Sequence, residues 1–216
     1  MPVIIIGVIL LGSIILLDKF AFGEFGISQP IMVGTIFGAI FGDIQSGILV
    51  GAGLQLIFLG GLPIGRDIPP DGQAAGIIGC SSFFIMRTAY PLGQSLFLAL
   101  FFALIASVCG GVLEIAARRL NDRLSSGYRK RVQRLALYHL SGLITAFGRG
   151  ICIITPFVLI ASLVPIPAQC PGINPSMFLI ITTGIGLAHA LYLFIKRSTI
   201  LYMIIGGLCG LALLVL

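Results

Sequence analysis

The stretch that decides the fold runs from Ser28 to Cys80 and reads SQPIMVGTIFGAIFGDIQSGILVGAGLQLIFLGGLPIGRDIPPDGQAAGIIGC. It is apolar and rich in glycine, and its few polar side chains stand apart from one another, at Gln29, Asp43, Gln45, Gln55, Arg66, Asp67 and Asp71. A bilayer makes such groups costly, so an ionisable residue in a membrane segment indicates a functional site. The stretch therefore predicts a membrane protein whose site is built around these side chains.

The composition extends this prediction to the whole chain. Its 216 residues are 58% hydrophobic and 9% charged, with a mean hydropathy of +1.14. A soluble domain carries about 25% charged residues. If each span takes about 20 residues, the length allows roughly six to eight spans. We therefore expect an all-α, polytopic, multi-pass membrane protein.

Positive charge is concentrated in one segment. Seven of the thirteen Lys and Arg residues lie between Arg118 and Arg134. Short basic loops stay in the cytoplasm, and contact with anionic lipid is a second explanation. Aromatic residues do not alternate with the charges, so we expect no nucleic-acid partner. The segment divides the chain into an N-terminal membrane half (1–117, with the glycine-rich core stretch 28–80), a basic cytoplasmic loop (118–134) and a C-terminal membrane half (135–216).

Each half is interrupted by a segment rich in proline, at Gly60–Gly72 and at Pro165–Pro175. Interruptions at corresponding places in two halves point to a transporter's binding site. Non-helical backbone at membrane depth is tolerated where it lines a cavity or is buried in protein, and an ordinary exposed turn is the alternative. The short run Ala74–Met86 favours a re-entrant or broken segment. We expect tilted, broken or re-entrant helices in two pseudo-symmetric halves.

Glycines recur every four residues on either side of Asp43, at Gly34, Gly38 and Gly42 and again at Gly47 and Gly51. This spacing places them on one helix face, where small residues let two backbones approach closely in lipid. The other apolar runs expected to form helices are Val3–Leu17, Ile44–Leu62, Leu92–Ala117, Leu135–Val164, Met177–Ile195 and Thr199–Leu216. We therefore expect two tightly packed helices around Asp43.

A family resemblance rests on residues spread along the chain, which are Gln29-Pro30, Gly42-Asp43, Gly47, Gly51, Leu54-Gln55-Leu56-Ile57, Leu59-Gly60, Pro70-Asp71, Ala74-Ala75, His139, Ser141, Arg149, Tyr202, Gly206 and Gly207. This pattern resembles the membrane IIC subunit of the mannose/fructose/sorbose class of the bacterial phosphoenolpyruvate-dependent sugar phosphotransferase system. The likeness covers nearly the whole chain and is most specific from Gly42 to Asp71. Position 55 is Gln where some family members have Glu.

The resemblance implies a sugar-translocating subunit in the bacterial inner membrane. It implies a IID membrane partner and assembly into a trimer of heterodimers. It also implies a cytoplasmic IIB protein, phosphorylated through IIA, that transfers its phosphoryl group to the sugar. The IIC subunit would then be non-catalytic, would hold no cofactor and would not itself be phosphorylated. His139 and His189 are accordingly expected in hydrogen bonds between helices rather than as phosphocarriers.

The candidate substrate-binding residues are Gln55, Asp71, Asp43 and Gln29. A sugar presents hydroxyl groups and no charge, so its site needs groups that donate and accept hydrogen bonds rather than a metal, and an amide does both. Each candidate has a purely structural alternative. Gln55 is equally suited to a hydrogen bond between helices, and either aspartate is suited to an N-cap, which aspartate favours.

Other functions also fit parts of the sequence. Arg149, Glu114 and the aspartates could line the pore of an ion or small-solute channel. A scaffold or receptor, including an orphan relative of the family, would need only the glycine packing. An intramembrane enzyme is disfavoured, because the sequence has no H-E-x-x-H or G-x-S-x-G motif. The five cysteines form no C-x-x-C pair, so we expect neither a disulfide framework nor a metal site.

Overall fold

The computed structural model describes residues 2–19, 21–59, 70–126, 135–165, 167 and 169–194, and this part of the chain is helical, without strands. Its elements are α1 (Pro2–Leu16), η1 (a 3₁₀ turn, Leu17–Lys19), α2 (Pro30–Phe41), α3 (Ile44–Phe58), α4 (Gly72–Arg87), α5 (Leu92–Ser126), α6 (Leu135–Leu163) and α7 (Pro175–Phe194). Pro30 stands at the first turn of α2, where its missing N–H costs nothing.

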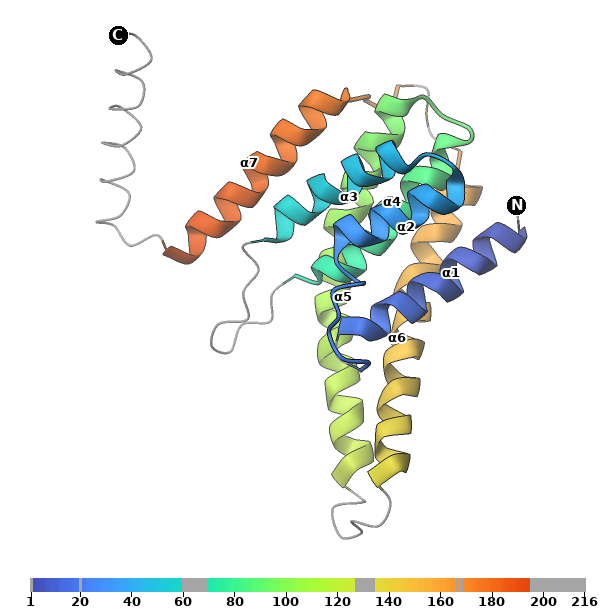
Figure 1. Cartoon of the computed structure of the whole chain (residues 1–216), viewed down its shortest axis with the longest axis vertical. Coiled ribbons are helices and arrows are strands. Elements are labelled where there is room, and N and C mark those ends of the chain that lie inside the picture. The colour runs from blue at the N-terminus through green and yellow to red at the C-terminus, as the bar shows by residue number, and fades with distance from the viewer. Residues whose placement is uncertain are drawn as a thin grey trace.

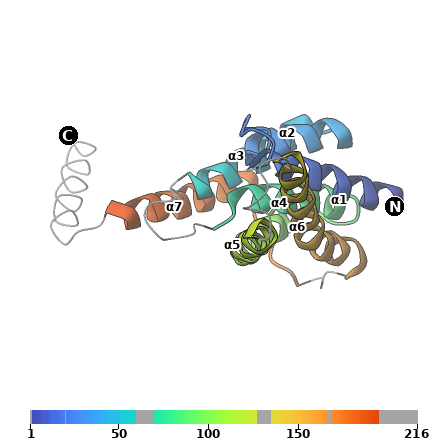
Figure 2. The same cartoon turned by 90° about the horizontal axis from the view of Figure 1, so that it is seen from below.

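Two long helices, α5 and α6, lie side by side in Figure 1, and α5 is seen end-on in Figure 2. Helices α1 to α4 gather beside one end of this pair, and α7 packs on α3 and extends away from α1. Three helical segments within the described residues are long and apolar enough to cross a membrane, namely Pro2–Lys19, Leu92–Ser125 and Ala136–Leu163. The predicted polytopic, all-α membrane fold is confirmed.

Helix α4 is the centre of the fold. Every residue from Ala74 to Met86 is buried, and the helix packs against α1, α2, α3, α5 and α6. Its N-terminal half is made mostly of small residues, which let five neighbours approach one short helix. The short apolar run predicts a re-entrant or broken segment here, and the structure has a continuous helix of 16 residues whose first turn follows Asp71.

Helices α2 and α3 form the tight pair that the glycine spacing predicts. A Cβ atom on Gly34 would meet the carbonyl oxygen of Gly47, and a Cβ on Gly47 would meet that of Gly34. Gly38 and Gly51 extend the same contact, so a larger side chain at any of the four would force the backbones apart. Gly42 is different: its φ of 78° ends α2 in the left-handed region. The tight pair brings the residue before α2 close to the last turns of α3.

The structure moves one predicted boundary. Helix α5 continues to Ser126, so residues 118–126 of the predicted basic loop are helical, and residues 127–134 lie outside the described part. In the first proline-rich break, residues 60–69 also lie outside it, including Arg66 and Asp67. The same holds for the last predicted helix, 199–216. The predicted internal symmetry and the three-part division of the chain stay predictions.

Candidate functional site

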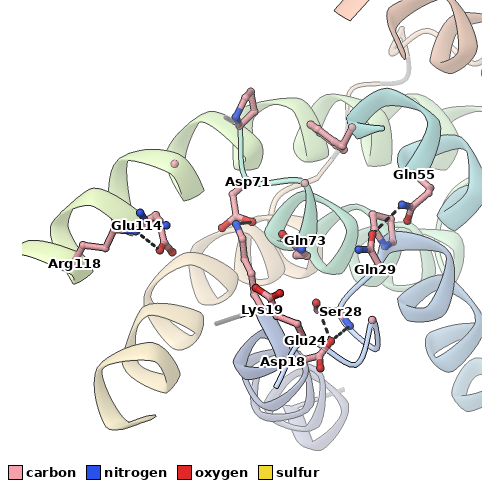
Figure 3. Close-up of a pocket in the computed structure, with 16 residues that line it drawn as sticks. Asp18, Lys19, Glu24, Ser28, Gln29, Gln55, Asp71, Gln73, Glu114 and Arg118 are labelled. Atoms are coloured by element: carbon pink, nitrogen blue, oxygen red, sulfur yellow. Dashed lines mark hydrogen bonds and ion pairs between the residues drawn. The ribbon is translucent and has the colours of Figure 1, made fainter. Parts of the chain in front are cut away.

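A cavity of about 430 Å³, here named the first cavity, opens among η1, residues 21–29, the ends of α2, α3 and α4 that face one another, and α5 (Figure 3). Its lining residues are Asp18, Lys19, Glu24, Gly26, Ser28, Gln29, Pro30, Gln55, Phe58, Pro70, Asp71, Gly72, Gln73, Gly111, Glu114 and Arg118. This volume lies in the range of small-molecule sites, about 300–1,000 Å³. Three of the four predicted site residues, Gln29, Gln55 and Asp71, line it.

Two of these residues form an amide pair. Gln55 Nε2 donates to Gln29 Oε1 at 2.8 Å, across the close contact between α2 and α3 (Figure 3). Gln55 Oε1 is buried and has no hydrogen-bond partner in the described part of the chain. An unsatisfied buried acceptor costs about 1–3 kcal/mol. The amide pair therefore keeps hydrogen-bonding capacity that a hydroxyl group could use.

Asp71 is the N-cap of α4 and the meeting point of two cations. Its Oδ1 accepts from the Ala74 N–H at 3.1 Å and from Lys19 Nζ at 2.7 Å, and its Oδ2 accepts from Arg149 Nη1 at 2.7 Å. The side chain is fully buried. Gly110 of α5 makes this possible, because a Cβ there would collide with Asp71. The predicted cap alternative is thus present at Asp71, together with an ion-pair role that no sequence pattern indicates.

The ion pairs continue beyond Asp71 into α5. Arg149 Nη1 also lies 2.9 Å from Glu114 Oε2, and Arg118 Nε lies 2.9 Å from Glu114 Oε1. Charges therefore alternate along a chain that joins η1, α4, α6 and α5. Arg149 and Glu114 are buried, whereas the Arg118 side chain is 57% exposed. Removing one partner of a buried ion pair typically costs about 3–5 kcal/mol, so these contacts lock the helices together.

Residues 21–29 form one wall of the first cavity, and Asp18 holds this wall in place. Its carboxylate accepts from the Phe25 N–H at 2.7 Å, the Ser28 N–H at 3.0 Å and the Ser28 hydroxyl at 3.2 Å. The loop between them contains Glu24 at a φ of 55°, an uncommon conformation for a residue with a side chain. Asp18 thereby fixes the backbone immediately before Gln29.

Asp43 does not line the first cavity. It is exposed in the turn between α2 and α3, where its Oδ1 accepts from the Ser46 N–H at 3.0 Å and caps α3. Hydrogen bonds from the side chain and main chain of Ser46 hold the pKa of its carboxyl below the usual range. The capping alternative describes Asp43, and the structure does not bring it together with the other three candidates.

A second cavity of about 250 Å³ borders the first. It lies between α5 and α6, and its lining residues are Leu16, Ala21, Glu114, Ala117, Arg118, Asn121, Tyr138, His139, Gly142, Leu143, Ala146 and Arg149. Glu114 and Arg118 line both cavities. The second cavity thus continues the first toward the basic end of α5.

The two histidines have different surroundings. His189 Nδ1 lies 3.4 Å from the carbonyl oxygen of Ile57, which is the predicted contact between helices. His139 is exposed and lines the second cavity. Among the described residues, no group of three or more His, Cys, Asp or Glu side chains is arranged to hold a metal ion.

Sequence reasoning missed several residues of the site. Lys19 and Asp18 read as the polar end of an apolar helix, and Gln73 reads as part of a helix start. Glu114 reads only as a candidate pore residue, and Arg149 reads as a candidate pore residue and as one of the residues that carry the family resemblance. One signal could have connected them: four ionisable residues lie inside or beside apolar runs, with opposite charges, and a bilayer strongly favours their pairing.

Comparison with known proteins gives a consistent result. The family model described as the sorbose-specific IIC component of the PTS (phosphotransferase system) matches residues 2–213. The mannose-specific EIIC component of Escherichia coli (strain K12) is 24% identical over 189 residues, which cover 85% of this chain and 67% of that protein. The sorbose-specific EIIC component of Klebsiella pneumoniae is 28% identical over 125 residues, covering 56% and 45%. The chain thus spans about two thirds of the length of the mannose-specific relative.

A solved structure has the same fold. A chain from a cryo-electron-microscopy structure of the mannose transporter ManYZ with microcin E492 aligns with a TM-score of 0.62 and 22% identity, over 94% of this chain and 80% of that chain. At this level of identity the likeness establishes the fold of the membrane helices.

Proposed function

We propose a substrate site and partners for this chain, which belongs to the family of sorbose-specific IIC components of the phosphotransferase system. The family resemblance read from the sequence is confirmed, and the chain is a sugar-translocating IIC permease subunit in a membrane. The proposal adds that the sugar is a hexose or a related sugar, that it crosses the bacterial inner membrane, and that it binds in the first cavity.

The observation that carries the proposal is the Gln55–Gln29 amide pair at the wall of the first cavity. Amides both donate and accept hydrogen bonds, as sugar hydroxyls do, and Gln55 Oε1 has no other partner in the described part of the chain. Asp71 lines the same cavity, but its buried carboxylate is occupied by ion pairs with Lys19 and Arg149. Asp71 therefore holds the wall of the site in place. Asp43 is assigned only to the cap of α3.

The proposed partners follow from the family. A IID membrane subunit would pair with this chain, and the pairs would assemble as a trimer of heterodimers; the fold likeness to a chain of the ManYZ transporter supports a membrane complex. A cytoplasmic IIB protein, charged through IIA, would then phosphorylate the sugar. The basic end of α5, with Arg118, Arg119 and Arg123, supports a cytoplasmic position for that end.

Uptake measurements test the proposal. Cells expressing this chain with its candidate IID, IIA and IIB partners are given labelled mannose, fructose or sorbose, and sugar phosphate is measured inside. Gln55→Ala is compared with Gln45→Ala, an exposed glutamine of the same helix outside the cavity. Losing the amide removes hydrogen bonds worth about 1–3 kcal/mol, a loss of affinity of roughly tenfold to a hundredfold. Gln45→Ala is expected to transport like the wild type.

Two results would count against the proposal. Solute flux through this chain in the absence of the partner proteins would favour a channel. The second result is equal uptake by Gln55→Ala, Gln45→Ala and the wild type, with equal amounts of each chain in the membrane. That result would show that the amide pair does not bind the sugar, and it would favour a scaffold role.

A further inference from the structure

The two cavities meet at a single ion pair. Glu114 and Arg118 line both, and the Arg118 Nε to Glu114 Oε1 distance is 2.9 Å. Arg118 lies about one helical turn before Asn121, which lines only the second cavity. A solute leaving the first cavity toward the basic end of α5 therefore reaches this ion pair and then the second cavity.

The cavities differ in charge. The first is lined by four carboxylates and two cations, a net formal charge of −2. The second is lined by Arg118 and Arg149 with Glu114 as its one carboxylate, a net formal charge of +1. Fixed charges in a site of low dielectric act strongly on a charged ligand. The first cavity thus disfavours an anion, and the second favours one.

Arg149 has donors left for a ligand. Its two ion pairs, with Asp71 Oδ2 and Glu114 Oε2, both use Nη1. A guanidinium carries five N–H donors in a rigid fork that fits the oxygens of a phosphate group. Because the arginine is buried and held by two carboxylates, its position in the wall of the second cavity is fixed in advance.

Arg118 is the more exposed of the two cations that line the second cavity. Its side chain is 57% exposed, whereas the Glu114 carboxylate with which it pairs is 9% exposed. If Arg118 turns away from Glu114, the buried carboxylate keeps its contact with Arg149. Arg118 therefore places a guanidinium at the border of the two cavities, where an anion in the second cavity can contact it.

Asn121 supplies a further polar group. Its Oδ1 is buried and has no hydrogen-bond partner in the part of the chain that the structure describes. Such an oxygen needs a donor, which a hydroxyl group of a sugar or a protonated phosphate oxygen provides. The volume of about 250 Å³ suits a phosphate group with part of a small sugar rather than a larger ligand.

We infer that the second cavity is a binding site for a phosphate monoester, and that its ligand is the phosphorylated sugar formed on the cytoplasmic side. The identity of this ligand rests on the proposed sugar transport; the affinity for phosphate does not. Arg149 and Arg118 bind the phosphate oxygens, and Asn121 accepts a hydrogen bond from the ligand. The negative first cavity then keeps the product from returning along the path by which the neutral sugar came.

The test uses the full chain in phosphatidylcholine nanodiscs, with NMR of isotope-labelled histidine side chains. The chain has two histidines. His139 lines the second cavity and His189 lies against Ile57 of α3, so one reports on the site and the other is an internal reference. Inorganic phosphate, added without sugar, is expected to shift the His139 signal in a saturable way and to leave the His189 signal unchanged.

Three variants locate the effect. Asn121→Asp adds a carboxylate to the second cavity alone and is expected to weaken phosphate binding about tenfold or more. Arg118→Gln removes a cation and is expected to weaken it by about the same factor, while Arg149 keeps Glu114 paired. Arg119→Gln, an exposed neighbour that lines neither cavity, is the control and should bind like the wild type. An unchanged His189 signal shows that a variant is folded.

Further arms distinguish the source of the phosphate. Mannose phosphate is expected to displace inorganic phosphate. The His139 signal should be the same in nanodiscs that contain phosphatidylglycerol as in nanodiscs of phosphatidylcholine alone. A lipid-dependent shift that blocks phosphate would make the cavity a lipid site and overturn the assignment. The assignment would also be overturned if inorganic phosphate did not shift the His139 signal, or if Asn121→Asp bound phosphate as tightly as the wild type. Because no sugar is used to detect phosphate, failure of Gln55→Ala to alter uptake would overturn the proposed function without changing this result.

Discussion

The first cavity and the second cavity share Glu114 and Arg118, yet their remaining walls give them opposite charge. The first receives carboxylates from η1, from the loop that follows it and from the cap of α4, namely Asp18, Glu24 and Asp71. The second receives its additional charge from α6, as Arg149. The same two residues of α5 thus serve a neutral ligand on one side and an anionic ligand on the other. The difference shows that the ligand charge each cavity prefers depends on which segments, besides α5, form its wall.

The largest expected effect comes from Asp71, which joins the two regions because it lines the first cavity and holds Arg149 of the second. Asp71→Ala leaves buried cations without this partner and removes the cap of α4, so we expect a loss of about 3–5 kcal/mol in stability. Thermal unfolding in detergent measures it, and both sugar uptake and phosphate binding should be lost. Asp43→Ala, an exposed cap, is the control and should cost about 1 kcal/mol. Equal losses from the two changes would contradict the role given to the ion pairs.

A smaller and more selective effect is expected from the α2–α3 contact. A Cβ on Gly34 would meet the backbone of Gly47 and Gly51, so Gly34→Ala should separate the helices that carry Gln29 and Gln55, at a cost of about 1–3 kcal/mol. Sugar uptake should fall while phosphate still shifts the His139 signal, because the second cavity uses neither helix. Gly184→Ala in α7, where a Cβ would have open space, is the matched control. A parallel loss of both ligands would mean that the cavities are not independent.

Much of this molecule could be predicted from its sequence, because the strongest signals are local. Hydropathy gives the membrane helices, and the spacing of Gly34, Gly38, Gly47 and Gly51 gives the α2–α3 contact. Gln29 and Gln55 could be chosen because an amide in an apolar run must find a partner. The contact between them, 26 residues apart, follows from the packing that the glycines allow.

The remainder depends on contacts between distant segments, for which the sequence holds no local signal. Asp71 and Arg149 are 78 residues apart, and Asp71 and Lys19 are 52 apart. Asp43 and Asp71 look alike in sequence, since each precedes a helix and caps it. Only the fold distinguishes them, by leaving Asp43 in an exposed turn and burying Asp71 between two cations. The second cavity has no motif, because its polar residues come from three consecutive turns of α5 and from a separate helix.

The most direct test of the central claim, that a neutral sugar and a phosphate group bind at different places, is equilibrium binding of the labelled sugar found in the uptake assay. Membranes containing the full chain are titrated with that sugar, with and without enough inorganic phosphate to saturate the His139 shift. We predict that phosphate changes the sugar affinity by no more than about twofold, a free-energy difference of roughly 0.4 kcal/mol. Gln55→Ala should weaken sugar binding by roughly tenfold to a hundredfold and leave phosphate binding unchanged. Displacement of the sugar in proportion to the phosphate bound would show a single shared site and contradict the central claim.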